Sequence, residues 1–207
     1  MTVLIEPALD PVASMLVPAA SMEAARRAMI DSQLRPSGVN NATVLAAFNR
    51  VRREDFVPEG ARGVAYMDRA VPLGGGCVLA PALSHGLMLV EAAVLPTDRV
   101  LLVDDGSGYL AALIAPLIAS LETIAPGEMP AGEDFTLLLI DGAIEHLPDA
   151  LVKRLGEGAR VVTGLIQRGV ARLATGRKAG SNVGFLTLGE ADFAPLAEYA
   201  LAAKWSF

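Results

Sequence analysis

The sequence is poor in the residues that build disulfides and metal centres: it has a single cysteine, Cys77, and two histidines, His85 and His146. One cysteine excludes a disulfide within the chain and fits a reducing compartment, so we expect a cytoplasmic protein. The histidines lie far apart in the sequence, and neither has a second histidine or a cysteine at metal-ligand spacing. We therefore expect no metal site, and we interpret Cys77 as a small buried apolar residue.

Basic residues are in deficit, with 17 Lys and Arg against 23 Asp and Glu and a net charge of −6. A protein that follows nucleic-acid phosphates needs clustered positive charge, so this balance argues against a nucleic-acid partner. The one cluster of arginines, at positions 26, 27, 50, 52 and 53, is flanked by acids. We interpret it as a solvated helix face.

Long uninterrupted apolar runs are missing as well. The chain of 207 residues is 53% hydrophobic, yet no run reaches the roughly 18 residues of a membrane-spanning helix. Residues 1–21 contain no Lys or Arg and are interrupted by three prolines, unlike a signal peptide. We therefore expect a globular protein without a membrane partner, in which residues 1–21 form an N-terminal extension to a single domain at 22–207.

The order of apolar patterns predicts an α/β fold. Helical spacing over 22–53, broken at RPSGVN, predicts two helices, the second capped by Asn41 or Thr43, and a third helix follows from about Pro81 to Ala93. Short apolar strands at 100–103, 136–140 and 159–166 then alternate with helical segments, which indicates a mainly parallel sheet. The late segments NVGFLTL and AKWSF predict an antiparallel pair at one edge, with Trp205 completing the core.

The stretch RVLLVDDGSGYLAAL, at 99–113, has the outline of a strand, a tight glycine turn and a helix start. This arrangement brings backbone N–H groups up to a nucleotide cofactor in α/β folds. Two acids, Asp104 and Asp105, stand in the turn itself. They act either as ligand contacts or as residues that cap the turn and the following helix without any ligand.

Five segments in order resemble protein-L-isoaspartate O-methyltransferase: REDFVP, AYMDRAVPLGGG, the PAL that opens a helix at Pro81, RVLLVDDGSGYLAAL, and DGAIEHLPDALVKRLGEGARVV. The resemblance implies a Rossmann-like class I methyltransferase fold. This is a three-layer sandwich with a mainly parallel sheet and an antiparallel C-terminal edge, in which a helical part at 22–95 precedes a Rossmann-like part at 96–207. It also implies S-adenosylmethionine as cofactor and, as substrates, damaged proteins or peptides whose isoaspartyl carboxyls are methylated.

The resemblance also implies a cofactor site, at Asp104, Asp105, Gly106, Ser107, Gly108 and Glu122. Only the segment Gly106 to Tyr109 matches the family turn, because Asp104 stands where the family has its first glycine and Leu102 where it has an acid. A displaced acid could contact the cofactor ammonium. Glu122 matches the acid that grips the ribose hydroxyls, with a solvated acid at a strand end as the alternative.

Two further departures concern the pocket. The family positions whose hydroxyl groups line the methyl-acceptor site fall on Cys77 and Leu79, and leucine cannot donate a hydrogen bond. After Glu122, only residues 123–133 precede the next strand, whereas a helix and a strand with their turns need roughly 20 to 25 residues. The outer strand on this edge, with the acid that meets the adenine, is therefore expected to be missing.

Three functions stay open. The chain is a working S-adenosylmethionine-dependent carboxyl methyltransferase with an altered pocket, a non-catalytic interaction or scaffold protein with the methyltransferase fold, or a binder of another nucleotide. The lost motif residues predict that methyl transfer to isoaspartyl peptides is weak or lost. No catalytic residue is assigned, and the sequence leaves the oligomeric state open.

Overall fold

The computed structural model describes residues 19–201. The first part is helical, with α1 (Ala19–Met29), α2 (Ala42–Arg50) and α3 (Ala82–Ala92), and it contains a short hairpin of β1 (Val71–Gly74) and β2 (Cys77–Leu79). Helix α2 begins where the sequence predicts, because the Asn41 side chain accepts hydrogen bonds from the N–H groups of Thr43 and Val44.

The second part is a six-stranded sheet in the order β4-β3-β5-β6-β7-β8. Its strands are β3 (Arg99–Asp104), β4 (Ser120–Ile124), β5 (Phe135–Ile144), β6 (Leu155–Gln167), β7 (Val170–Ala179) and β8 (Asn182–Glu190). The first four in this order run parallel, and β6, β7 and β8 form an antiparallel meander. The prediction of a mainly parallel sheet with an antiparallel C-terminal edge is confirmed.

The identity of the antiparallel pair differs from the prediction. Strand β8 contains the predicted NVGFLTL, but its partner is β7, a segment that the sequence analysis left without a strand. Only Leu173, Ala174 and Gly176 of β7 are buried, so the strand shows no apolar run, although a half-exposed antiparallel strand needs none. The segment AKWSF, with Trp205, lies outside the described residues.

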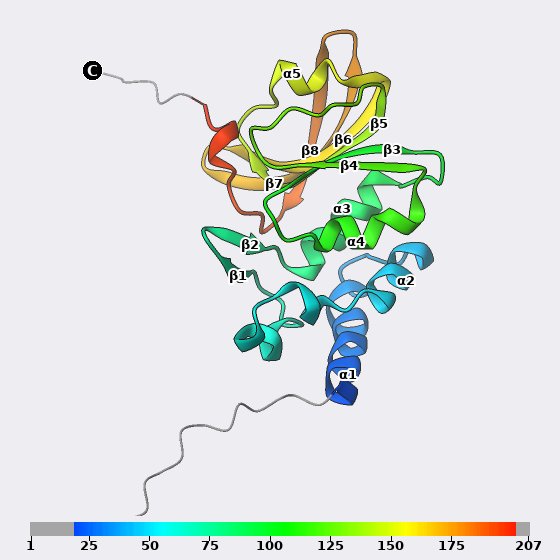
Figure 1. Ribbon diagram of the computed structural model, residues 1–207, viewed down its shortest axis with the longest axis vertical. Coiled ribbons are helices and arrows are strands. Elements are labelled where there is room, and N and C mark those ends of the chain that lie inside the picture. The colour runs from blue at the N-terminus through cyan, green and yellow to red at the C-terminus, as the bar shows by residue number, and fades with distance from the viewer. Residues whose placement is uncertain (1–18, 202–207) are drawn as a thin grey trace, which may run out of the picture.

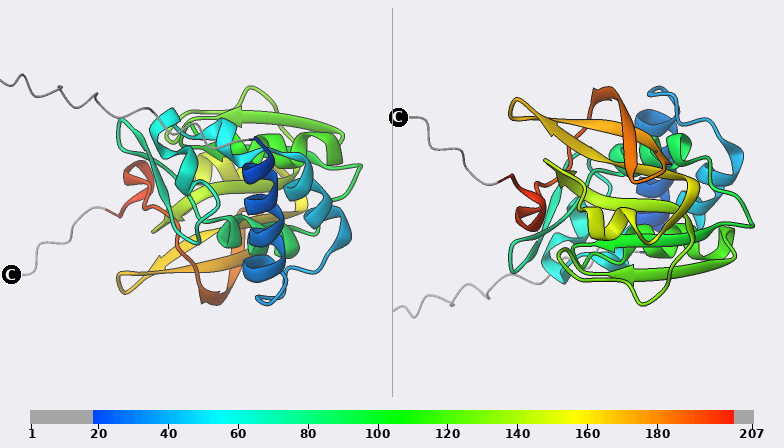
Figure 2. Two further views of the ribbon diagram at one scale, coloured as in Figure 1. Left: turned by 90° about the horizontal axis from the view of Figure 1, so that it is seen from below. Right: turned by 90° about the horizontal axis from the view of Figure 1, so that it is seen from above.

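Helices α1, α2 and α3, together with the helix that follows β3, lie on one face of the sheet (Figures 1 and 2). Val100 and Leu102 of β3 point into this larger core, where α3 and α4 (Tyr109–Ile114) pack. Leu101 and Val103 point to the opposite face, where the third layer consists of the short helix α5 (Asp149–Val152) and an irregular segment containing Leu196 and Tyr199. Alternate side chains of one strand therefore serve two cores of unequal depth.

The predicted loss of the outer strand is confirmed in the described part of the chain. Strand β4 forms the edge of the sheet, and residues 125–134 run directly to β5 without a helix or strand. Because a missing edge strand breaks no inner ladder, the rest of the sheet keeps its order. None of the helices described is long and apolar enough to cross a membrane.

Candidate functional site

The candidate site lies at the carboxyl ends of β3 and β5, where open α/β sheets bind their ligands. Asp104 ends β3 and is the register partner of Asp141 on β5. The turn after β3 contains two left-handed glycines, Gly106 with φ 100° and Gly108 with φ 67°. Only glycine adopts these angles at low cost, so the sequence GSG fixes the shape of the turn before α4.

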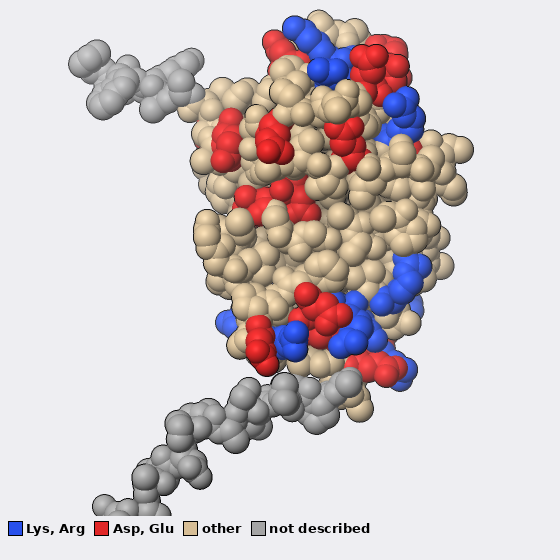
Figure 3. Space-filling view, viewed as in Figure 1, with Lys and Arg blue, Asp and Glu red and all other residues tan. Residues whose placement is uncertain are grey.

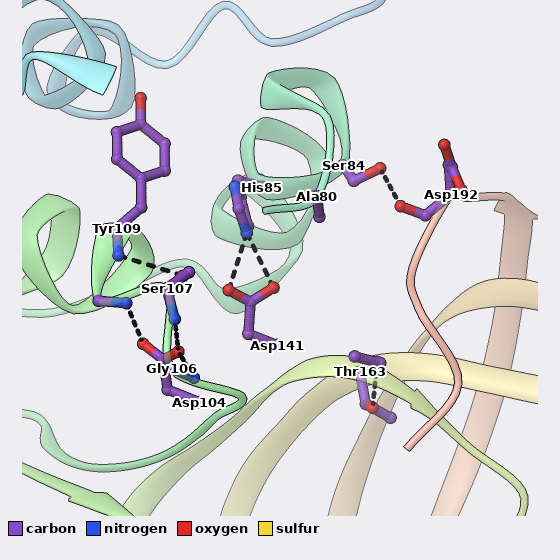
Figure 4. Close-up of polar contacts among 12 residues, drawn as sticks. Ala80, Ser84, His85, Asp104, Gly106, Ser107, Tyr109, Asp141, Thr163 and Asp192 are labelled. Atoms are coloured by element: carbon purple, nitrogen blue, oxygen red, sulfur yellow. Dashed lines mark hydrogen bonds and ion pairs between the residues drawn. The ribbon is translucent and has the colours of Figure 1, made fainter. Parts of the chain in front are cut away.

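Asp104 folds back beneath this turn (Figure 4). Its Oδ1 accepts hydrogen bonds from the N–H groups of Gly106 and Ser107, both at 2.8 Å, and its Oδ2 accepts one from Gly108 N–H at 2.9 Å. Of the two interpretations offered by the sequence, this geometry favours the capping one for Asp104. Burial raises the pKa of Asp104, and the neighbouring Asp141 carboxylate adds to the rise, against the lowering by the three N–H groups.

Asp105 lies at the rim of the turn and is half-buried. It makes no hydrogen bond within residues 19–201, and its surroundings are acidic. Burial raises its pKa first, and the negative charges of Glu198, Asp104 and Asp141 raise it further. Figure 3 shows acidic atoms exposed at the middle of one face, between the sheet and the helical part, with no basic side chain beside them.

The buried His85 of α3 binds Asp141 (Figure 4). Its Nε2 lies 2.8 Å and 3.0 Å from the two carboxylate oxygens, while its Nδ1 has no hydrogen-bond partner in the described part of the chain. The sequence analysis predicts a helix around His85 and no metal site there, and it missed this contact. The available signal was Asp141 itself, an acid that follows an apolar strand and so stands at the ligand edge of the sheet.

A buried arginine, Arg53, connects the segments that pack near the turn. Arg53 is fully buried, which corrects its interpretation as part of a solvated face. Its Nε donates to the carbonyl of Ala65 at 2.7 Å and its Nη2 to the carbonyl of Ala80 at 2.5 Å. Its guanidinium lies 4.9 Å from the ring centre of Tyr109, the residue after Gly108. Two backbone carbonyls and one ring from distant segments contact this cation, while its buried Nη1 has no hydrogen-bond partner among the described residues. Local charge spacing cannot reveal such a pattern.

The segment expected to form the acceptor site does lie against the turn. A Cβ built on Gly106 would be 3.8 Å from Cys77 Sγ, so β2 and the turn are in contact there. Cys77 is half-buried, while Leu79 is fully buried in the larger core. Neither residue offers a hydroxyl group to the site.

The sequence suggested that Glu122 ends its strand, but β4 continues beyond it. Glu122 stands two residues before the end of β4, level with Leu101. Its oxygens accept hydrogen bonds from the N–H groups of Ala131 at 2.6 Å and Gly132 at 3.0 Å, so the shortened connection occupies them. The structure does not bring Glu122 together with the turn residues in any hydrogen bond among those described.

No group of three or more His, Cys, Asp or Glu side chains within residues 19–201 has the geometry to hold a metal ion. The candidate site therefore consists of the glycine turn, its acids, and the hairpin strand β2 against it.

Comparisons with known proteins show which family this chain resembles. The family model for protein-L-isoaspartate(D-aspartate) O-methyltransferase matches residues 24–125 and so ends one residue after β4, where the short connection begins. A protein-L-isoaspartate O-methyltransferase of Roseiflexus sp. (strain RS-1) is 30% identical over 199 residues, which cover 83% of this chain and 91% of that protein. One from Methanoculleus marisnigri is 28% identical, with 83% of this chain and 90% of the other covered.

A solved structure with the same assignment as these relatives has a similar fold. A Plasmodium falciparum protein assigned as a protein-L-isoaspartate O-methyltransferase, solved in complex with S-adenosyl-L-homocysteine, superposes with a TM-score of 0.68 at 16% identity. The alignment covers 86% of this chain and 98% of that one. At this identity the likeness concerns the fold.

Proposed function

This chain belongs to the protein-L-isoaspartate O-methyltransferase family, and from that premise we propose that it is an S-adenosylmethionine-dependent methyltransferase that acts slowly on isoaspartyl carboxyls of damaged proteins. The observation that carries the proposal is the left-handed glycine turn at the end of β3 with β2 packed against it. Such a turn brings a backbone free of side chains up to a ligand at the switch point of the sheet.

The residues at the turn fit the cationic part of the cofactor. S-adenosylmethionine, when bound, supplies an electrophilic methyl group on a sulfonium and also carries an ammonium. Asp105 and the nearby Asp141 would supply negative charge to hold these cations, and Gly106 and Gly108 place no side chain in the turn. Asp104 keeps the turn in shape from beneath.

Three features of the chain's own residues lower the expected rate. The N–H groups of the turn are already paired with Asp104. The Glu122 carboxylate is held by the connection at 131–132. At the acceptor segment, Cys77 and Leu79 offer no hydroxyl to a substrate carboxylate. Losing about 3 kcal/mol of transition-state stabilisation lowers a rate roughly 150-fold.

A second function, a non-catalytic interaction protein, is favoured by one specific observation. Two of the three acids expected to contact the cofactor, Asp104 and Glu122, accept hydrogen bonds from backbone N–H groups of nearby loops, as a chain without a ligand requires. In either case we place the protein in the cytoplasm, which the single cysteine supports, with a protein partner rather than a nucleic acid or a membrane.

The test is a methyl-transfer assay with labelled S-adenosylmethionine and an isoaspartyl peptide, with the matching aspartyl peptide as control. We expect slow, base-labile labelling of the isoaspartyl peptide only. No labelling, combined with no calorimetric signal for the cofactor, would leave the non-catalytic function. Rapid turnover by the isolated chain would contradict the role given to the lost hydroxyl groups.

A matched pair of variants distinguishes a loss of cofactor binding at the turn from a general effect of backbone strain on folding. Gly106→Ala places a Cβ on a residue with φ 100°, and Gly38→Ala does the same at φ 93° in a turn with open space around it. We expect Gly106→Ala to lose cofactor binding and Gly38→Ala to retain it. Equal loss in both would assign the effect to folding.

A further inference from the structure

Three N–H groups of the turn after β3 are already taken by a carboxylate of the chain itself. The N–H groups of Gly106, Ser107 and Gly108 point to one place, and Asp104 fills that place with its own carboxylate. A backbone turn of this kind ordinarily offers its N–H groups to an anion. Here the same groups are already neutralised by an anion that belongs to the chain.

The charge left at the turn is negative. Asp104, Asp105 and Asp141 lie within electrostatic reach of one another, since each pair contributes to a raised pKa of Asp104 or Asp105. No Lys or Arg in residues 19–201 forms an ion pair with any of the three, although Asp141 binds the buried His85 and lies within electrostatic reach of the buried Arg53. Glu198, on the segment beside the turn, adds a fourth negative charge near Asp105.

From the filled N–H groups and from carboxylates that form no ion pair with a Lys or Arg of the described residues, we propose that this turn selects its nucleoside ligand by positive charge and does not recognise the ligand's carboxylate. This rests on the proposed function for the position of the ligand and goes beyond it in assigning specificity. S-adenosylmethionine, with a sulfonium, binds more tightly than S-adenosylhomocysteine, a neutral thioether of nearly the same shape. At the distances of neighbouring side chains, one added charge changes affinity by about tenfold or more.

The selectivity favours release of the product after each methyl transfer. When the acceptor oxygen bonds to the methyl carbon, the carbon–sulfur bond breaks and its electron pair stays on sulfur. The ligand thereby loses the sulfonium charge and keeps the ammonium, so its attraction to Asp105 and Asp141 is weakened. The product therefore leaves readily, and product inhibition is weak.

The experiment is calorimetric titration of the whole chain with three ligands that form a charge series at pH 7.5. These are S-adenosylhomocysteine, with no net charge, S-adenosylmethionine, with one positive charge, and decarboxylated S-adenosylmethionine, with two. We expect affinity to rise along the series, by about tenfold at the first step. The decarboxylated ligand is the sharpest probe because it removes the group that the turn no longer recognises.

Two variants with the same change of charge assign the effect. Asp105→Asn removes a carboxylate that makes no hydrogen bond within the described residues, and Glu133→Gln removes an exposed one at the opposite end of the strands. We expect the preference for S-adenosylmethionine over S-adenosylhomocysteine to fall severalfold in Asp105→Asn and to stay unchanged in Glu133→Gln. Thermal denaturation of each variant verifies that it folds.

The outcomes separate the two proposals. If both natural ligands bind and S-adenosylhomocysteine binds as tightly or more tightly, the charge selectivity is wrong and the cofactor site stands. If the preference is present but equal in Asp105→Asn and wild type, these acids are not its source and the inference fails. If none of the three ligands binds, the cofactor site and the inference fall together.

Discussion

Strand β3 has an aspartate at each end, and the pKa values of the two acids are shifted in opposite directions. Asp98, just before the strand, is 2% exposed, and Asp104, its last residue, is 6% exposed. At Asp98 burial opposes ionisation, yet hydrogen bonds from Arg160, the Leu95 N–H and Thr136 outweigh it and lower the pKa. At Asp104 burial and Asp141 win over three N–H groups, and the pKa rises.

The difference lies in the countercharge rather than in burial or in the number of hydrogen bonds. Asp98 has a guanidinium, whose Nη2 contacts its carboxylate, while Asp104 has a second carboxylate as its neighbour. A buried acid that is paired with a cation of the chain forms a structural ion pair. A buried acid without one keeps an unfavourable charge that a cationic ligand relieves.

The largest expected effect comes from removing the ion pair between Asp98 and Arg160. Arg160→Met leaves Asp98 buried and unpaired and also removes the bonds that Arg160 donates to the carbonyls of Ala92 and Ala93 at the end of α3. We expect the free energy of unfolding to fall by about 3–5 kcal/mol, measured by urea denaturation. A loss under about 1 kcal/mol would mean that the two ends of β3 do not differ as described.

The same pair predicts a pH dependence. Because the folded pKa of Asp98 lies below its ordinary value of 3.8, its contribution is fully present above pH 3.8 and is lost as the pH falls through the folded pKa. We expect Arg160→Met to lose less stability than the wild type over that acid range.

The next effect concerns the carboxyl end. Asp104→Gly restores the family residue, removes the three hydrogen bonds beneath the turn and frees the N–H groups above it. We expect a loss of about 1–3 kcal/mol of stability together with tighter binding of S-adenosylhomocysteine, measured by denaturation and by calorimetry. A titration unchanged from wild type would show that the turn is not a cofactor site.

The smallest effect has the opposite sign. Asp105 has a raised pKa and no compensating hydrogen bond in residues 19–201, so its ionised form costs stability in the folded state. Asp105→Asn is expected to stabilise the protein slightly at pH 7, by about 0.5 kcal/mol given its partial exposure. The gain disappears below pH 3.8, where both states of the wild type are protonated. Destabilisation at pH 7 would assign Asp105 a structural contact.

The sequence predicted the features that depend on neighbouring residues and missed the contacts between distant segments. Asn41 as a helix cap, the apolar strand before Asp104 and the missing strand after Glu122 could all be predicted, because each rests on a few neighbouring residues. The His85–Asp141 pair and the Arg53–Tyr109 stack could not, because each joins segments that only the fold brings together. Strand β7 was missed for a different reason, since its few buried side chains give no apolar pattern.

The shortened connection at 125–134 also bears on the order in which the chain folds. Strands β3 and β5 pair directly, and every residue between them must be gathered into a loop when they meet. The entropy lost in closing a loop grows with the logarithm of its length, by about 0.6 kcal/mol per doubling. A family member with the full helix and strand closes a longer loop at this step. In this chain the pair β3–β5 of inner strands forms at a lower entropic cost, and we expect it to belong to the folding nucleus.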